Sequence, residues 1–176
     1  KYAGTKNLCI AKMGDGALRQ GAVHEAFNLA MLYKSPVIFV IENNDYAMGT
    51  SVVRSTKSPS LWERGAAYGI KGEEVDGMSV LAVKEAGERA VAYCRSGKGP
   101  YILEVKTYRY RGHSMSDPAK YRTRDEVQKM RDERDPIEQI RDMLLTGKHA
   151  SDDDLKAIDK EIKSIVNEAA EFSKES

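Results

Sequence analysis

The chain has 176 residues, of which 41% are hydrophobic and 31% charged, and its formal net charge is +1 at pH 7. This length suits a single domain with a substantial core, and the balanced charge gives no general reason to expect nucleic-acid binding. No signal peptide or membrane-spanning apolar run is evident, so we expect a soluble protein that does not attach to membranes. The two cysteines, Cys9 and Cys94, have no zinc-ligand spacing and are expected to be buried small hydrophobes in a reducing compartment.

The first segment predicts a strand, helix, strand unit. Residues 7–13 have the composition of a strand, and residues 37–41 (VIFVI) form a continuous apolar run typical of a buried parallel strand. Between them, residues 19–33 carry apolar side chains at helical spacing, namely Ala22, Ala26, Leu29 and Tyr33, widened by Val23, Phe27 and Ala30. Such a unit places the carboxyl ends of its two strands at one edge of a sheet.

Two short motifs follow these strands. Gly14-Asp15-Gly16 comes after the first strand and Asn43-Asn44 after the second. Each alone is typical of a turn or cap. Together they can bring one carboxylate and one amide oxygen to a single divalent cation, while glycine lets a diphosphate approach backbone N–H groups at a helix start. The pattern therefore predicts a cation and diphosphate site at this edge.

The next elements continue the same architecture. We expect a short helix at 60–68, a strand at 72–75, a helix at 80–95 and a strand at 101–107. These elements give at least four strands in a mainly parallel sheet with helices on both faces. The predicted fold class is therefore α/β, with the cofactor-binding region over residues 1–121.

The remaining residues, 122–176, are expected to form a helical extension that packs on the domain or on a partner. Thr123 with Glu126 predicts a capping box, and Asp135-Pro136 begins a helix that ends at Gly147. Ser151 with Asp154 caps a last helix. That helix has a narrow apolar seam suited to another helix or to the domain body, formed by Leu155, Ile158, Ile162, Ile165, Ala169 and Phe172.

The loop at 108–121 is the second candidate functional region. It follows a strand and, with its flank, carries several cations and a histidine: Arg109, Arg111, His113, Arg122 and Arg124. This composition suits a loop beside an anion, and an imidazole there could move a proton or bind a diphosphate. From the residues alone, a solvated basic turn with a satisfied histidine explains the same pattern.

The order of motifs resembles a known family. The elements are GDG, a helix-length spacer and NN, followed by ENNDYAMGTS (42–51), EVDGMS (74–79) and YRYRGHSMSDP (108–118). They resemble the alpha subunits of the acetyl-transferring pyruvate dehydrogenases, which are thiamine diphosphate-dependent 2-oxoacid dehydrogenases. The likeness covers all 176 residues but only the carboxyl-terminal portion of those subunits, so we interpret the chain as truncated.

The resemblance implies specific roles. Asp15 and Asn44 would bind Mg²⁺ through their side chains and Tyr46 through its backbone carbonyl, while Gly16 and Ala17 would offer N–H groups to the diphosphate of thiamine diphosphate. His113 would contact the cofactor near the substrate and is the candidate catalytic residue.

The resemblance also bears on regulation. Ser114 and Ser51 match positions that are phosphorylated in animal members. The loop here is one residue shorter and lacks a later serine of those members, which puts phosphorylation control in doubt and makes the chain look more bacterial.

The implied reaction is oxidative decarboxylation of pyruvate with acetyl transfer to a lipoyl group. The implied partners are a beta subunit in an α₂β₂ heterotetramer, which would supply the glutamate that activates the cofactor, and the lipoyl domain of dihydrolipoyl acetyltransferase. The expected location is the cytoplasm of a bacterium, or the mitochondrial matrix of a eukaryote. The alternatives are an acetoin or branched-chain 2-oxoacid dehydrogenase alpha subunit, and a fragment that only folds or docks and is inactive alone.

Overall fold

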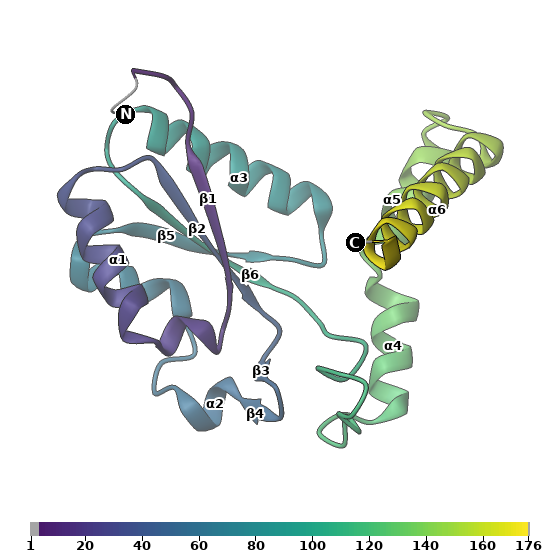
Figure 1. Ribbon diagram of the computed structural model, residues 1–176, viewed down its shortest axis with the longest axis horizontal. Coiled ribbons are helices and arrows are strands. Elements are labelled where there is room, and N and C mark those ends of the chain that lie inside the picture. Colours follow the sequence, from purple (N-terminus) through teal and green to yellow (C-terminus); the bar gives the residue numbers. More distant parts are fainter. Residues whose placement is uncertain (1–3, 176) are drawn as a thin grey trace. The chain divides into compact units, whose positions relative to one another are not determined.

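The computed structural model describes residues 4–175. They form two compact units that meet in sequence between Arg134 and Asp135. The first unit is an α/β domain with the sheet at its centre, and the second consists of helices (Figure 1).

The sheet of the first unit is entirely parallel. Its strands are β1 (Cys9–Gly14), β2 (Val37–Asn43), β6 (Tyr101–Lys106) and β5 (Lys71–Asp76), in that spatial order. Gly14 pairs with Glu42, and Asn43 pairs with Lys106. The carboxyl ends of β1, β2 and β6 therefore lie side by side at one edge of the sheet.

Helices cover both faces of this sheet, as Figure 1 shows. Phe39, Ile41 and Ile102 face one apolar cluster, which also contains residues of α1 (Gly21–Leu32) and the 3₁₀ helix η2 (Leu61–Tyr68). The alternate strand residues, Ile38, Leu103 and Val105 among them, face a second cluster with Ala86, Ala90 and Cys94 of α3 (Val80–Arg95). This alternation is the period of two that a doubly covered sheet requires.

The face that α1 buries differs from the predicted stripe. Phe27 and Ala30 are buried against the sheet, whereas Leu29 and Tyr33 are 42% and 63% exposed. The helix is therefore oriented by its largest ring, which meets Phe39 edge to face with 4.8 Å between ring centroids. The alanines at 22 and 26 fit the helical period without being buried in this chain.

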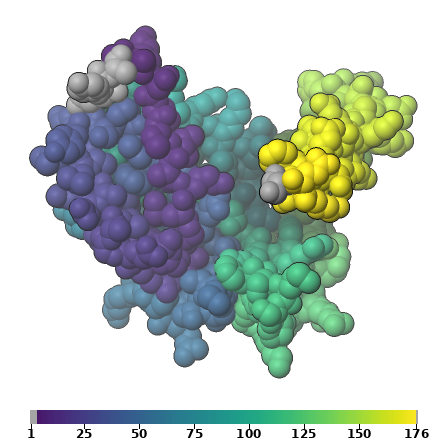
Figure 2. Space-filling model, viewed as in Figure 1, coloured from purple at the N-terminus to yellow at the C-terminus, as the bar shows by residue number. Residues whose placement is uncertain are grey.

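The prediction that both cysteines are buried is wrong for Cys9. Cys94 on α3 is buried, but Cys9 is exposed because β1 lies at the edge of the sheet. Ile10 in the same strand is 59% exposed, and β1 forms part of the surface of the first unit in the space-filling view (Figure 2).

Short elements follow the strands at the carboxyl edge. A 3₁₀ turn, η1 (Ala17–Arg19), follows β1, and a small hairpin, β3 (Tyr46–Ala47) with β4 (Thr50–Ser51), follows β2 and leads into α2 (Val52–Ser55). Asp45 and Met48 on this hairpin have φ values of 68° and 55°, in the left-handed region. Directly after Gly16 the chain forms the 3₁₀ turn η1, and the α-helix α1 begins only at Gly21.

The predicted caps at Asp135 and Ser151 are present, whereas the predicted capping box of Thr123 and Glu126 is only half formed, because the Glu126 carboxylate accepts from the Tyr108 hydroxyl instead. The Glu126 amide donates to Thr123 Oγ1 (3.1 Å) before α4 (Arg124–Arg134), and Asp135 accepts from the first turn of α5 (Pro136–Thr146). Ser151 and Asp154 exchange the two bonds of a capping box at the start of α6 (Asp152–Glu175). None of the helices between residues 4 and 175 combines the length and apolar character of a membrane span.

Candidate active site at the carboxyl edge of the sheet

A cavity of about 360 Å³ lies where the two predicted motifs meet. Asp15 directly follows β1, Asn44 directly follows β2, and Arg109 and His113 come from the chain after β6. Because these strands are neighbours and parallel, their following residues converge at one place. The structure thus brings together all six predicted cofactor and metal residues, with lining formed by Gly14, Asp15, Gly16, Ala17, Asn44, Tyr46, Ala47, Met48, Arg109 and His113.

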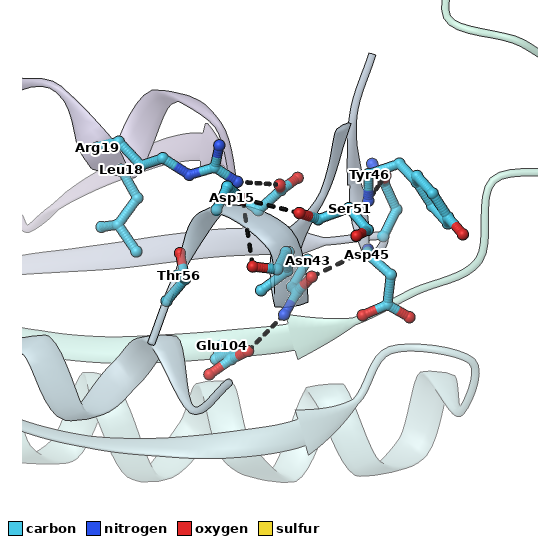
Figure 3. Close-up of polar contacts among 12 residues, drawn as sticks. Asp15, Leu18, Arg19, Asn43, Asp45, Tyr46, Ser51, Thr56 and Glu104 are labelled. Atoms are coloured by element: carbon cyan, nitrogen blue, oxygen red, sulfur yellow. Dashed lines mark hydrogen bonds and ion pairs between the residues drawn. The ribbon is translucent and has the colours of Figure 1, made fainter. Parts of the chain in front are cut away.

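Asp15 is the buried carboxylate of this cavity. Its side chain is only 3% exposed, and Arg19 Nη2 lies 3.5 Å from Oδ2 (Figure 3). Burial raises the pKa of the Asp15 carboxyl above its ordinary value, and attraction to Arg19 and Arg109 opposes this shift without cancelling it. A carboxylate whose charge is this poorly solvated gains from a cation placed in the cavity.

The two adjacent asparagines have different surroundings. Asn43 is fully buried, where its Nδ2 donates to Glu104 Oε1 (2.6 Å) and its Oδ1 accepts from the Asp45 amide (3.0 Å), as Figure 3 shows. Asn44 is half-buried and lines the cavity, and its Oδ1 accepts from the Tyr46 amide at 3.3 Å. An amide oxygen has two lone pairs, so Asn44 keeps acceptor capacity toward the cavity, whereas Asn43 is committed to the fold.

Gly16 is required by a close approach between the motifs. A Cβ atom added at Gly16 would lie 2.8 Å from the Cβ of Ala47. At Gly14 the same addition meets no described atom within 4 Å. The second glycine of the GDG motif therefore lets the first motif pack against the hairpin of the second.

The side chain of Tyr46 packs against the loop rather than pointing a free hydroxyl at the cavity. Its ring stacks on Tyr121 with 4.5 Å between centroids, and its hydroxyl donates to the Tyr121 carbonyl at 3.5 Å. A ligand role for Tyr46 would thus fall to its backbone.

Arg122 joins the turn after β2 to the chain after β6. Its Nη2 donates to the Asn44 carbonyl (2.7 Å) and its Nη1 to the Arg109 carbonyl. The guanidinium also lies 4.1 Å from the ring centroid of Tyr108 and 5.0 Å from that of Tyr46. Sequence reasoning named Arg122 only as one of several cations, because nothing local to it indicates these contacts.

Asp117 organises the loop that carries His113. Its carboxylate accepts from the His113 amide (2.7 Å), the Ala119 amide (2.9 Å) and the Tyr121 hydroxyl (2.9 Å). These hydrogen bonds hold the pKa of Asp117 below its usual value. The sequence SDP at 116–118 is a turn signal that could have indicated this role.

The groups around the cavity suit an anion. Nη1 of Arg109 and Nε of Arg19 are buried, and neither has a hydrogen-bond partner among residues 4–175. Arg109 also lines a second cavity of about 530 Å³ whose wall carries Arg111, Lys120, Arg122, Arg124 and Arg131. Buried guanidinium donors without an acceptor are costly, so an acceptor with negative charge would be favoured there.

A metal at this place would need a mixed set of oxygen ligands. Within the described part of the chain, no group of three or more His, Cys, Asp or Glu side chains is arranged to hold a metal ion. One carboxylate, one amide oxygen and a backbone carbonyl match hard cations such as Mg²⁺, which keep waters and phosphate oxygens as further ligands.

The two serines named as modification candidates lie near this region. Ser114 lines a neighbouring cavity of about 240 Å³ together with Met48, His113 and Asp117, and its Oγ is 3.0 Å from that of Ser116. Ser51 pairs with Tyr46 in the hairpin, and its carbonyl accepts from Ser55 Oγ (2.8 Å).

Comparisons with known proteins identify the family of this chain. The family described as "Dehydrogenase E1 component" matches residues 1–176. The "Pyruvate dehydrogenase E1 component subunit alpha" of Rhizobium meliloti (strain 1021) is 58% identical over 173 residues, which are 98% of this chain and 50% of that protein.

Two further relatives also match nearly all of this chain but only about half of their own length. The protein of that name in Rickettsia bellii (strain RML369-C) is 52% identical over 176 residues, all of this chain and 54% of the relative. The mitochondrial one of Dictyostelium discoideum is 53% identical over 172 residues, 97% of this chain and 45% of the relative. The chain thus spans about half the length of the curated relatives it matches. With the whole sequence matched, this chain belongs to the dehydrogenase E1 component family.

Proposed function

We propose that this chain supplies the Mg²⁺ and diphosphate half of the active site in the alpha subunit of a pyruvate dehydrogenase E1 component. The observation that carries the proposal is the single cavity into which Asp15, Gly16, Asn44 and His113 converge from separate strand ends. The names of the relatives support pyruvate rather than acetoin or branched-chain 2-oxoacids as substrate.

Each residue has a proposed task. Asp15 and Asn44 would bind Mg²⁺ through side-chain oxygens, and Tyr46 through its backbone carbonyl. The backbone N–H groups of Gly16 and Ala17 would bind the diphosphate. Arg109, whose buried Nη1 has no hydrogen-bond partner within residues 4–175, would add a charged donor to the same anion.

Thiamine diphosphate, when bound, supplies the carbon nucleophile for the keto group of pyruvate and accepts the electron pair left by loss of carbon dioxide. Around it, this chain would orient the diphosphate and keep the loop at 108–121 in place. His113, the proposed catalytic residue, would hold or transfer a proton at its imidazole near the substrate.

The rest of the machinery is proposed to come from partners. A beta subunit would complete an α₂β₂ heterotetramer and contribute the glutamate that activates the cofactor, and a lipoyl domain of dihydrolipoyl acetyltransferase would accept the acetyl group. The protein would work in the cytoplasm of a bacterium or in a mitochondrial matrix, the latter in line with the mitochondrial relative.

Phosphorylation of Ser114 would inhibit such a site. The phosphate would add nearly two negative charges beside Asp117, whose carboxylate holds the loop, and near the cavity meant for an anionic substrate. Ser51 is the second candidate position, on the hairpin that carries Tyr46.

The direct test uses the full-length chain co-expressed with its beta subunit. Calorimetry with thiamine diphosphate should show binding that requires Mg²⁺ in the wild type and is abolished in Asp15→Ala. The matched control is Asp153→Ala, which removes a carboxylate that is 93% exposed in the second unit. Equal cofactor binding by Asp15→Ala and the control would refute the proposed site.

Substrate profiling of the same preparation separates the remaining alternatives. Pyruvate should be decarboxylated much faster than branched-chain 2-oxoacids, and equal rates would remove the preference for pyruvate. Residues 1–176 by themselves are expected to show no turnover, so decarboxylation of pyruvate by that piece without a beta subunit would contradict the proposed division of the active site.

A further inference from the structure

Glu104 is a fully buried carboxylate in the central strand β6. Its side chain is 0% exposed, and it lies on the face of the strand that also carries Ile102 of the first apolar cluster. A carboxylate in such a place is strongly destabilising unless its oxygens are hydrogen-bonded. None of the roles proposed above uses this residue.

Both oxygens of Glu104 have partners. Oε1 accepts from Asn43 Nδ2 at 2.6 Å, and Oε2 accepts from the backbone amide of Trp62 at 3.0 Å. The Arg64 guanidinium is near enough to be attracted to this charge, and it donates to the Leu18 carbonyl of η1 at 3.3 Å. Glu104 is thus bonded directly to the residue that precedes Asn44, whereas only the attraction of Arg64 relates it to η1.

The backbone amide of Asp45 fixes which way the Asn43 amide points. A backbone N–H only donates, so Oδ1 of Asn43 must face Asp45, and Nδ2 then faces Oε1 of Glu104, to which it donates. Oδ1 then accepts the amide of Asp45 at 3.0 Å, a residue whose φ of 68° lies in the left-handed region. The next residues on either side are Asn44 and Tyr46, which line the cavity.

We propose that Glu104 is a positioning residue for the cation site. Through Asn43 it holds the Asp45 amide, and through that bond it holds Asn44 and the Tyr46 backbone at the distance at which they can share a cation with Asp15. This inference rests on the proposed function for its metal, but the hydrogen-bonded chain itself does not depend on a ligand.

Glu104→Gln tests the series of hydrogen bonds from Glu104 through Asn43 to Asp45, and it does so with almost no change in side-chain volume. The introduced glutamine has one acceptor and one amide donor, but it faces two donors, Asn43 Nδ2 and the Trp62 amide. If Asn43 flips to accept from the glutamine, its own Nδ2 then faces the Asp45 amide. One buried donor therefore stays unpaired in either orientation.

The double variant Asn43→Asp with Glu104→Gln should restore every bond. The introduced aspartate would accept from the amide group of the introduced glutamine and from the Asp45 amide, and the glutamine oxygen would accept from the Trp62 amide. The network still contains one carboxyl group and one carboxamide group. Rescue by this exchange separates the proposed hydrogen-bond relay from a requirement for a carboxylate at position 104.

The first measurement is Mg²⁺ affinity in the presence of thiamine diphosphate, by calorimetry on the full-length chain with its beta subunit. We expect Glu104→Gln to weaken Mg²⁺ binding by about 10–100-fold, the usual effect of losing a group that orients a metal ligand. The double variant should return to within about threefold of the wild type. The control is Glu73→Gln. Glu73 is on β5 of the same sheet, pairs with Arg89 of α3 and does not line the cavity, so the Mg²⁺ affinity of this variant should not change.

The second measurement is amide hydrogen exchange of residues 43–47 in the metal-free protein. Exchange should become faster in Glu104→Gln and return to wild-type rates in the double variant, while Glu73→Gln leaves it unchanged. The exchange measurement needs no cofactor, so it tests the role of Glu104 even if the wild type binds no thiamine diphosphate. Failure of the wild type to bind thiamine diphosphate would overturn only the proposed function.

Wild-type Mg²⁺ affinity and exchange in Glu104→Gln would overturn the inference, even if its unfolding temperature falls. If Glu104→Gln does not fold, the double variant decides. If the double variant has Mg²⁺ affinity and amide exchange like those of the wild type, the hydrogen-bond relay from Glu104 through Asn43 to Asp45 is supported. A tenfold loss of Mg²⁺ affinity in the double variant refutes it.

Discussion

Replacing Gly16 by alanine tests the packing of the two motifs against each other. The new Cβ would lie 2.8 Å from the Cβ of Ala47, about 0.6 Å inside the 3.4 Å at which ordinary contact begins. Gly16 has φ −67° and ψ −42°, which alanine adopts readily, so the effect would be steric. The hairpin must move away or the 3₁₀ turn must shift, and overpacking of this kind costs about 1–3 kcal/mol.

The assay combines urea denaturation with cofactor calorimetry on the full-length protein. We expect Gly16→Ala to lower the free energy of unfolding by that amount and to weaken thiamine diphosphate binding, since Gly16 lines the cavity. Gly14→Ala is the matched control, because its Cβ meets open space and should change the free energy of unfolding by less than about 0.5 kcal/mol. Adding Ala47→Gly to Gly16→Ala should recover most of the loss. Equal behaviour of the two alanine variants, or no recovery in the double variant, would refute the steric reasoning.

Three more variants probe the site. Asp15→Asn should abolish Mg²⁺-dependent stabilisation yet raise the free energy of unfolding of the metal-free protein by about 0.5–2 kcal/mol, because burial raises the pKa of this carboxyl and favours a neutral side chain. Because the pKa of Asp15 is higher in the folded than in the unfolded protein, protonation of Asp15 contributes to the free energy of unfolding. This contribution is complete below the unfolded-state pKa and is lost as pH rises through the folded-state pKa. The advantage of Asp15→Asn should therefore grow with pH across that window, and an advantage that shrinks would contradict the assignment. Arg122→Lys keeps the charge but loses the forked donors to the Asn44 and Arg109 carbonyls. Limited proteolysis should therefore cut the loop at 108–121 faster in this variant than in the control Arg124→Lys, which changes an exposed arginine. Equal cleavage of the two variants would argue against the contact. Tyr46→Phe should change stability by less than about 1 kcal/mol and leave Mg²⁺ affinity intact, since its hydroxyl makes only a 3.5 Å bond; loss of metal binding would implicate the side chain.

Much of the fold could be predicted from local patterns. The strand around VIFVI and the helix α3 stand out in sequence, because a doubly covered strand is continuously apolar and α3 keeps Ala86, Ala90 and Cys94 on one face. The buried face of α1 could not be read in the same way. Its apolar residues extend around the helix, and only the contact of Phe27 with Phe39 decides which side meets the sheet.

In the candidate site too, some residues could be predicted from local motifs and others depend on contacts between distant parts of the sequence. Convergence of Asp15 and Asn44 follows from parallel strands that end at one edge, so the motif spacing was sufficient. Arg122 reaches Asn44 across 78 residues of sequence, and Glu104 reaches Asn43 across 61, distances at which no local pattern operates. One signal was nevertheless available, because a glutamate inside the apolar strand YILEVK indicates a buried carboxyl group with hydrogen-bond partners.

The position of β1 has a practical consequence for laboratory work. It is the outer strand of the described sheet, so among residues 4–175 one side of its backbone faces no neighbouring strand. An open row of amide and carbonyl groups can recruit a strand from another molecule, and the exposed Ile10 would add apolar contact to such pairing. Preparations limited to these residues should therefore be checked for aggregation by light scattering before a lack of ligand binding is interpreted.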